Sequence, residues 1–176
     1  MDNIYLTVDE LMLPFKEVIG SDYEKYRNHV CRVVGNCLLL DKNPANLRKY
    51  AIAGVFHDIG IWTNHTIDYL APSIVVAGNY LIQENLQEIA KEIELMIYWH
   101  HKPTSYKGIF RDTVNNFRKA DWMDVSLGAL AFGADRSLAE AYRKQFRNCG
   151  FHLFLLRKIF KNLLRHPFNP LPMFKL

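Results

Sequence analysis

Apolar residues recur every three to four positions along nearly the whole chain, and this helical spacing is the feature that most narrows its possible folds. It predicts helices at residues 7–19, 22–40, 44–62, 70–84, 86–101, 112–131, 135–148 and 151–165. Thr7, Asp22 and the pair Asn43-Pro44 are the start signals of the first three. Only residues 74–77 have the composition of a strand, and a buried helix explains them equally well. We therefore expect an all-α fold.

The length and composition indicate one folded domain. A chain of 176 residues with 49% hydrophobic and 23% charged residues is typical of a soluble globular protein. No apolar run approaches the roughly 18 residues of a membrane span, and the first residues do not resemble a secretory signal. The three cysteines are scattered and form no disulfide or zinc pattern. We expect a cytoplasmic protein with no transmembrane segment.

The net charge of +4 is concentrated at the C-terminal end, because residues 143–176 contain eight basic residues and no acidic one. We expect residues 151–176 to form a basic helix and a proline-rich arm that pack on the same domain as residues 1–150. Whether this helix also docks a partner stays open, and nucleic acid is not expected. The oligomeric state is not readable from the sequence. Four apolar residues of the helix share one face: Leu153, Leu156, Phe160 and Leu163.

Several polar residues occupy positions where the helical pattern requires a core residue. His29 borders the apolar row of the helix predicted at 22–40, and Asp58 lies within the row of the helix at 44–62. His100 and Asp121 occupy comparable positions on two later helices. A buried carboxylate is costly unless it is paired or bound to a cation, and imidazole with carboxylate is a common ligand set of divalent metals. We predict that these residues share a metal ion.

The order of these residues resembles the HD superfamily of metal-dependent phosphohydrolases, whose pattern is a lone His, a later His-Asp doublet and a distant Asp. The lone His is His29 in YRNHVCRV, the doublet is His57-Asp58 in VFHDIG, and the closing residue is Asp121 in RKADWM. The resemblance covers about residues 22–130. It implies a single-domain helical bundle of the HD type, with these four residues as the metal ligands.

The resemblance also implies an activity: hydrolysis of a small phosphoester or nucleotide by attack of metal-bound hydroxide at phosphorus. In this interpretation His57 and Asp58 are the catalytic residues. The cofactor is a divalent cation, Mn, Fe, Co, Ni, Zn or Mg, with one ion favoured over two. His100 and His101 lie where two-metal members often carry histidine, and they are candidates for a second metal or for the substrate phosphate. Weaker candidates for binding phosphate are Lys102 and Arg118.

Two other functions remain open. The same metal centre could serve a hydratase or an oxygenase that acts on a small organic molecule, with Ile61, Trp62 and Tyr69 forming a rather apolar pocket. Alternatively, the chain could be a non-catalytic HD module that senses a nucleotide and uses its basic C-terminal helix to dock a partner. The retained ligand pattern favours the enzyme.

Overall fold

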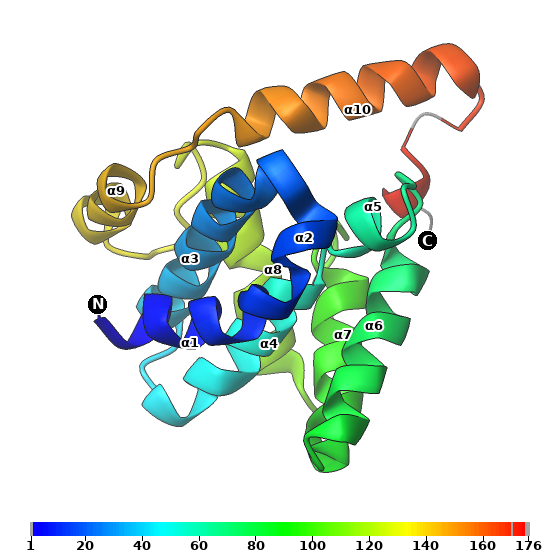
Figure 1. Ribbon diagram of the computed structural model, residues 1–176. Coiled ribbons are helices and arrows are strands. Elements are labelled where there is room, and N and C mark those ends of the chain that lie inside the picture. Colours follow the sequence, from blue (N-terminus) through cyan, green and yellow to red (C-terminus); the bar gives the residue numbers. More distant parts are fainter. Residues whose placement is uncertain (1, 170, 175–176) are drawn as a thin grey trace.

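The computed structural model describes residues 2–169 and 171–174, and every helix or strand assigned in them is an α- or 3-10 helix (Figure 1). The all-α prediction is therefore confirmed. The longer helices are α1 (Asp2–Met12), α3 (Tyr23–Leu40), α4 (Leu47–Phe56), α6 (Leu70–Gln83), α7 (Ala90–Trp99), α8 (Arg111–Val125), α9 (Arg136–Gln145) and α10 (Phe151–Arg165). The short elements are α2 (Lys16–Ile19), α5 (Gly60–Thr63) and the 3-10 turns Leu13–Phe15, Gly20–Asp22, Pro44–Asn46, Gln87–Ile89 and Pro172–Phe174.

The predicted start signals are partly right. The side chain of Asn43 accepts the amide proton of Ala45 and caps the turn before α4, as expected. Thr7 lies inside α1, which begins earlier than predicted, and it is therefore no cap. Asp22 precedes α3 but makes no capping hydrogen bond, because its carboxylate accepts the indole proton of Trp62 instead. Residues 74–77, the ambiguous stretch, are helical and belong to α6.

Several predicted helices end earlier than their apolar pattern suggested; those expected at 112–131 and 135–148 end at Val125 and Gln145. The helix expected at 44–62 stops at Phe56, so that His57 and Asp58 lie in a turn between α4 and α5. The amide of Asp58 donates to the hydroxyl of Tyr26 at 3.3 Å, which takes the place of a helical carbonyl. The helix expected at 86–101 likewise ends as α7 before His100. Both histidine-containing segments therefore sit at helix ends, where the chain changes direction.

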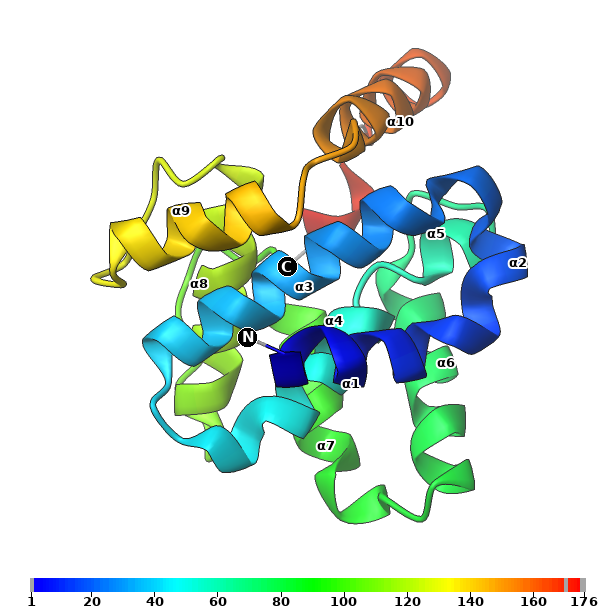
Figure 2. The ribbon, with the colours of Figure 1, turned by 60° about the vertical axis from the view of Figure 1, so that its left-hand side comes forward.

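The middle of the bundle is formed by α3, which packs along α8 and against α4, while α7 contacts α8, α4 and α6 (Figures 1 and 2). The crossing of α3 and α4 is close at Gly54. A Cβ atom there would lie 3.1 Å from Val34 and 3.2 Å from Val30. This close contact brings the middle of α3 beside the C-terminal end of α4, which is where the polar residues of the core meet.

Helix α10 crosses over the end of the bundle (Figures 1 and 2). Its inward anchor is Phe151, which is fully buried and stacks on the ring of His29 at 4.2 Å between centroids. The arm that follows turns back to the body, where Met173 is buried. The apolar row noted in the sequence faces solvent, with exposed fractions of 51% for Leu153, 62% for Leu156, 61% for Phe160 and 39% for Leu163. No helix in the described residues is long and apolar enough to cross a membrane.

Candidate metal centre

Four different helices bring the polar core residues together. His29 projects from the middle of α3 and Asp121 from α8, while His57 and Asp58 follow the end of α4 and His100 follows the end of α7. All five side chains are buried, with exposed fractions of 3% or less. The structure thus places the residues of the sequence motif in one cluster, although they are spread over more than 90 positions of the chain.

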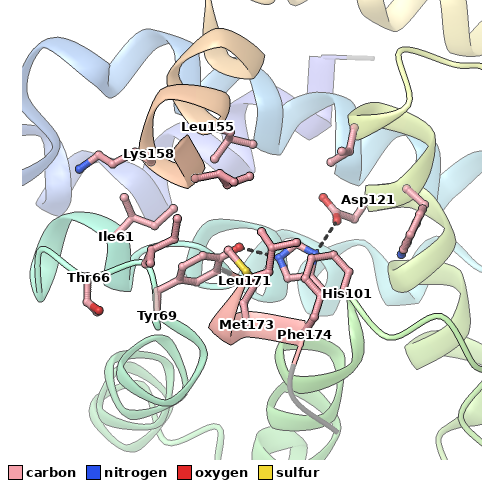
Figure 3. Close-up of a pocket in the computed structure, with 14 residues that line it drawn as sticks. Ile61, Thr66, Tyr69, His101, Asp121, Leu155, Lys158, Leu171, Met173 and Phe174 are labelled. Atoms are coloured by element: carbon pink, nitrogen blue, oxygen red, sulfur yellow. Dashed lines mark hydrogen bonds and ion pairs between the residues drawn. The ribbon is translucent and has the colours of Figure 1, made fainter. Parts of the chain in front are cut away.

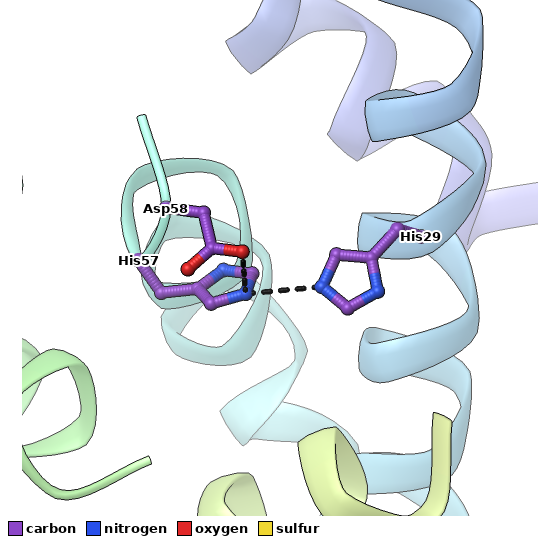
Figure 4. Close-up of side chains that lie close together, drawn as sticks. All are labelled: His29, His57 and Asp58. Atoms are coloured by element: carbon purple, nitrogen blue, oxygen red, sulfur yellow. Dashed lines mark hydrogen bonds and ion pairs between the residues drawn. The ribbon is translucent and has the colours of Figure 1, made fainter. Parts of the chain in front are cut away.

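The closest approach in the cluster is between two imidazoles. Nε2 of His29 lies 3.1 Å from Nε2 of His57 (Figure 4). Oδ1 of Asp121 is 3.6 Å from the first nitrogen and 3.8 Å from the second, and Oδ2 of Asp58 is 3.4 Å from Nε2 of His57. These four residues are the predicted ligand set, and their ligand atoms point at one small volume.

The other ring nitrogen of each histidine is occupied by a hydrogen bond. Nδ1 of His57 donates to the carbonyl oxygen of Gly54 at 2.7 Å, and Nδ1 of His29 donates to the carboxylate of Asp124 at 2.7 Å. In a neutral imidazole this leaves Nε2 with a lone pair and no proton. Burial lowers the pKa of His57 to about 3, which disfavours a proton there. Two lone pairs that face each other in this way repel unless a proton or a metal ion lies between them.

The hydrogen-bonding arrangement of His57 recurs at the end of α7. Nδ1 of His100 donates to the carbonyl oxygen of Ile97 at 2.6 Å, three residues earlier, just as His57 does with Gly54. Its Nε2 lies 3.6 Å from Oδ1 of Asp58. Neither of these two buried atoms has a hydrogen-bond partner among the residues that the structure describes. Orphaned polar atoms in a core are costly, and a cation or a proton shared between them would satisfy both.

His101 is partly buried beside this group. Its Nε2 is hydrogen-bonded to the hydroxyl of Tyr69 at 2.5 Å, and its Nδ1 lies 3.9 Å from Oδ2 of Asp121. Two overlapping sets of side chains therefore have ligand atoms within 4.8 Å of one another, and each could hold a metal ion. The first consists of His29, His57 and Asp58, and the second of Asp58, His100 and His101.

The carboxylates of the centre have strongly perturbed acidities. Burial raises the pKa of Asp121 to about 6, and the nearby charges of Asp58 and Asp124 act in the same direction against the histidines. Burial also acts to raise the pKa of Asp58, but the adjacent His57 and His100 outweigh it and hold that pKa well below its usual value. Closely spaced buried carboxylates are expected where a divalent cation balances their charge.

Two residues that support the centre were not found from the sequence. Asp124 is 2% exposed and accepts from Nδ1 of His29, and it also accepts from the Arg32 guanidinium at 2.6 and 2.9 Å. These hydrogen bonds outweigh burial and hold the pKa of Asp124 well below its usual value. The available signal was spacing: Asp124 follows Asp121 by three residues, and Arg32 follows His29 by three. Tyr26 was also missed, and its hydroxyl donates to the Val55 carbonyl at 2.8 Å.

The two weaker phosphate candidates lie in the protein interior. The ammonium group of Lys102 lies 4.6 Å from the centre of the Tyr98 ring, and the side chain is 2% exposed. The guanidinium of Arg118 donates to the Lys102 carbonyl at 3.2 Å and to the Ser105 hydroxyl at 3.4 Å. Neither residue lines the cavity described below.

A cavity of about 260 Å³ adjoins the centre on the side of Asp121 and His101 (Figure 3). In Figure 3, α10 lies above the cavity and the C-terminal arm below it, while α5 and the segment before α6 lie on the left and Asp121 of α8 on the right. Of the three residues predicted to form an apolar pocket, Ile61 and Tyr69 line it and Trp62 does not. The full lining consists of Ile61, Thr66, Ile67, Tyr69, His101, Asp121, Trp122, Val125, Leu155, Lys158, Ile159, Leu171, Met173 and Phe174.

The chain was also compared with protein-family models, with curated proteins and with solved structures. None of these three comparisons gives a match.

Proposed function

We propose that this protein is a metal-dependent hydrolase of the HD type that acts on a small phosphoester. The observation that carries the proposal is the convergence of hydrogen-bond acceptors in the core. Nε2 of His29 lies 3.1 Å from Nε2 of His57, Oδ1 of Asp121 lies within 3.8 Å of both nitrogens, and Oδ2 of Asp58 is 3.4 Å from Nε2 of His57. Such a set of nitrogen and oxygen ligands suits a divalent cation, with Mn, Fe, Co, Ni, Zn and Mg as the candidates.

The roles of the side chains follow from this arrangement. His29, His57, Asp58 and Asp121 would hold the ion, and His100 with His101 would hold a second ion or the substrate phosphate. A bound divalent cation supplies positive charge to the phosphoryl oxygens and lowers the pKa of a coordinated water. The hydrogen bond from His57 to Gly54 keeps Nε2 of that histidine free of a proton.

Proton transfer would be carried by Asp58 and His100. Oδ1 of Asp58 has no hydrogen-bond partner among the described residues and can accept a proton from the attacking water. Nε2 of His100 lies 3.6 Å from that oxygen. Although burial opposes it, the carboxylates of Asp58 and Asp121 raise the pKa of His100, so this ring can hold a proton and pass it to a leaving oxygen.

Aromatic rings exclude water from the other side of the centre. Phe151 stacks on His29, and the edge of Phe117 meets the His57 ring at 5.7 Å between centroids. Both phenylalanines are fully buried. Access to the centre is therefore through the cavity beside Asp121 and His101. Exclusion of water by the surrounding apolar side chains lowers the local dielectric constant, and this strengthens electrostatic interactions between the reacting groups.

The test is metal analysis of the wild type and of Asp58→Asn, followed by phosphate release from simple phosphomonoesters. We expect about one ion per chain in the wild type and loss of both metal and hydrolysis in the variant. Asp112→Asn is the matched control, because Asp112 is an exposed aspartate on α8. Far-UV circular dichroism checks that each variant is folded. If Asp58→Asn kept its metal and its hydrolysis, the proposal would be wrong.

A second reaction at the same centre is hydration or oxygenation of a small organic molecule. The observation that favours it is the predominantly apolar lining of the cavity that opens onto Asp121 and His101. The two reactions are told apart by their products, because only a phosphohydrolase releases inorganic phosphate. Metal-loaded protein that binds phosphate analogues but turns over neither class of compound would instead indicate the non-catalytic sensor.

A further inference from the structure

The cavity beside the metal centre has an almost entirely apolar wall. Nine of its lining side chains are hydrocarbon, thioether or aromatic groups from α5, the segment before α6, α8, α10 and the C-terminal arm. The polar groups at one end are Asp121 and His101, which belong to the centre. The Tyr69 hydroxyl is already hydrogen-bonded to His101. The other polar groups of the lining residues are those of Thr66 and Lys158 and the indole N–H of Trp122, which has no hydrogen-bond partner among the described residues.

Lys158 contributes its aliphatic stem to the wall. Its ammonium group lies 5.4 Å from the centre of the Phe154 ring, and Figure 3 shows the side chain pointing away from Asp121. Among the described lining residues it is the sole lysine or arginine. A phosphate in this space would therefore find its positive charge at the metal centre and not along the wall.

These properties discriminate between classes of substrate. A nucleoside carries ribose hydroxyls and base edges, and each of them loses water on entering the cavity and needs a new hydrogen-bond partner. The wall offers few such partners. An apolar body gains free energy in the same space, and its size fits, since an apolar cavity of ~150 Å³ already accommodates benzene.

We infer that the substrate is a phosphomonoester with an aromatic or short aliphatic body, and that this body fills the cavity while the phosphate sits at the end formed by Asp121 and His101. The placement of the phosphate beside Asp121 and His101 rests on the proposed function. The placement of the apolar body rests only on the apolar lining of the cavity. Of the small phosphoester or nucleotide expected from the sequence, it favours the phosphoester, with one anionic group and no further polar surface.

The inference is tested by calorimetric titration of the metal-loaded protein with phosphonates, which cannot be hydrolysed. The probes are inorganic phosphate, methyl-, ethyl-, propyl- and butylphosphonate, phenylphosphonate and adenosine monophosphate. We expect affinity to rise about fourfold for each added methylene. Phenylphosphonate should bind more tightly than methylphosphonate, and adenosine monophosphate no more tightly than inorganic phosphate. A flat alkyl series, or adenosine monophosphate as the tightest ligand, would overturn the inference.

A pair of neighbouring substitutions locates the binding. Leu155 lines the cavity, whereas the neighbouring Leu156 does not line it and is 62% exposed. Leu155→Trp should remove the gain with chain length and leave the binding of inorganic phosphate unchanged, and Leu156→Trp should match the wild type. Ile159→Phe, also in the wall, should reproduce the first result if Leu155→Trp does not fold. Equal alkyl gains in wall and control variants would also contradict the inference.

Failure of the metal centre gives a different result from failure of the cavity assignment. Without a functional centre, inorganic phosphate does not bind at all. Toluene, which needs no metal, should then still show saturation transfer in ligand-observed NMR with the metal-free protein, and Leu155→Trp should abolish it. Absence of toluene binding in the wild type would refute the apolar end, whatever the metal does.

Discussion

The carboxylate of Asp124 links the stability of the bundle to the metal centre, and Asp124→Asn should therefore reduce both. The substitution removes the charge that faces the Arg32 guanidinium at 2.6 and 2.9 Å. Arg32 is 2% exposed, and the other acceptor bonded to it is the carbonyl oxygen of Phe146 at 2.8 Å. A buried guanidinium left without its counter-ion costs about 3–5 kcal/mol of unfolding free energy.

The same substitution should weaken metal binding. Asp124 keeps the proton of His29 on Nδ1, and this leaves Nε2 available as a ligand. An amide can present either an oxygen or an NH₂ group to that nitrogen, so the tautomer is no longer enforced. Loss of such a supporting hydrogen bond typically lowers metal affinity about 10–100-fold. Arg32→Met is the matched control, because it breaks the same ion pair but leaves the hydrogen bond between Asp124 and His29.

Urea denaturation of the metal-free proteins measures the first effect, and calorimetric titration with Mn²⁺ or Co²⁺ measures the second. Both variants should lose several kcal/mol of stability, and Asp124→Asn should lose clearly more metal affinity than Arg32→Met. The reasoning is refuted if Asp124→Asn lowers the free energy of unfolding by less than about 1 kcal/mol, which is no more than the loss of one ordinary hydrogen bond. It is also refuted if the two variants bind metal equally well.

Two further predictions concern packing and thiol reactivity. Gly60→Ala should cost about 1–3 kcal/mol in urea denaturation, because its Cβ would lie 2.7 Å from a backbone carbonyl oxygen. A Cβ at Gly78 in α6 would have no neighbour within 4 Å, so Gly78→Ala should raise the free energy of unfolding by about 0.5–1 kcal/mol. Equal effects of the two substitutions would contradict this difference in packing. Cys149 is exposed and should react with Ellman's reagent in the native protein at pH 8. Cys31 and Cys37 are buried, and burial raises the pKa of Cys31 to about 12, so both should react only in urea. Native reaction of three thiols would contradict this burial.

The helices and the core positions of the motif residues could be predicted because both depend on spacing within a single helix. His29 and Asp121 lie in the interiors of α3 and α8, and their burial follows from the apolar rows beside them. The positions of His57 and Asp58 were less predictable. The apolar pattern continues through them, whereas the helix stops because Tyr26, 32 positions earlier than Asp58, offers its hydroxyl to the backbone.

The supporting ion pair was not predictable from local pattern. Arg32 and Asp124 are 92 positions apart, and each one alone reads as an ordinary polar residue on a helix. Their pairing depends on the packing of α3 along α8, which is a property of the whole bundle. The face of α10 that packs on the bundle was not predictable for the same reason. Its amphipathic pattern does not show which face meets the body, and the row of Leu153 and Leu156 faces solvent.

The sequence by itself determined that the chain is helical and that His29, Asp58 and Asp121 lie inside, because backbone periodicity and burial are short-range consequences of residue order. Only the tertiary structure decided which nitrogen of His29 is free, since Asp124, 95 positions later on α8, settles this through a hydrogen bond. It also decided the character of the cavity. Its wall joins Ile61 to Leu155 and other side chains far apart in the sequence, and such contacts exist only once the bundle has closed.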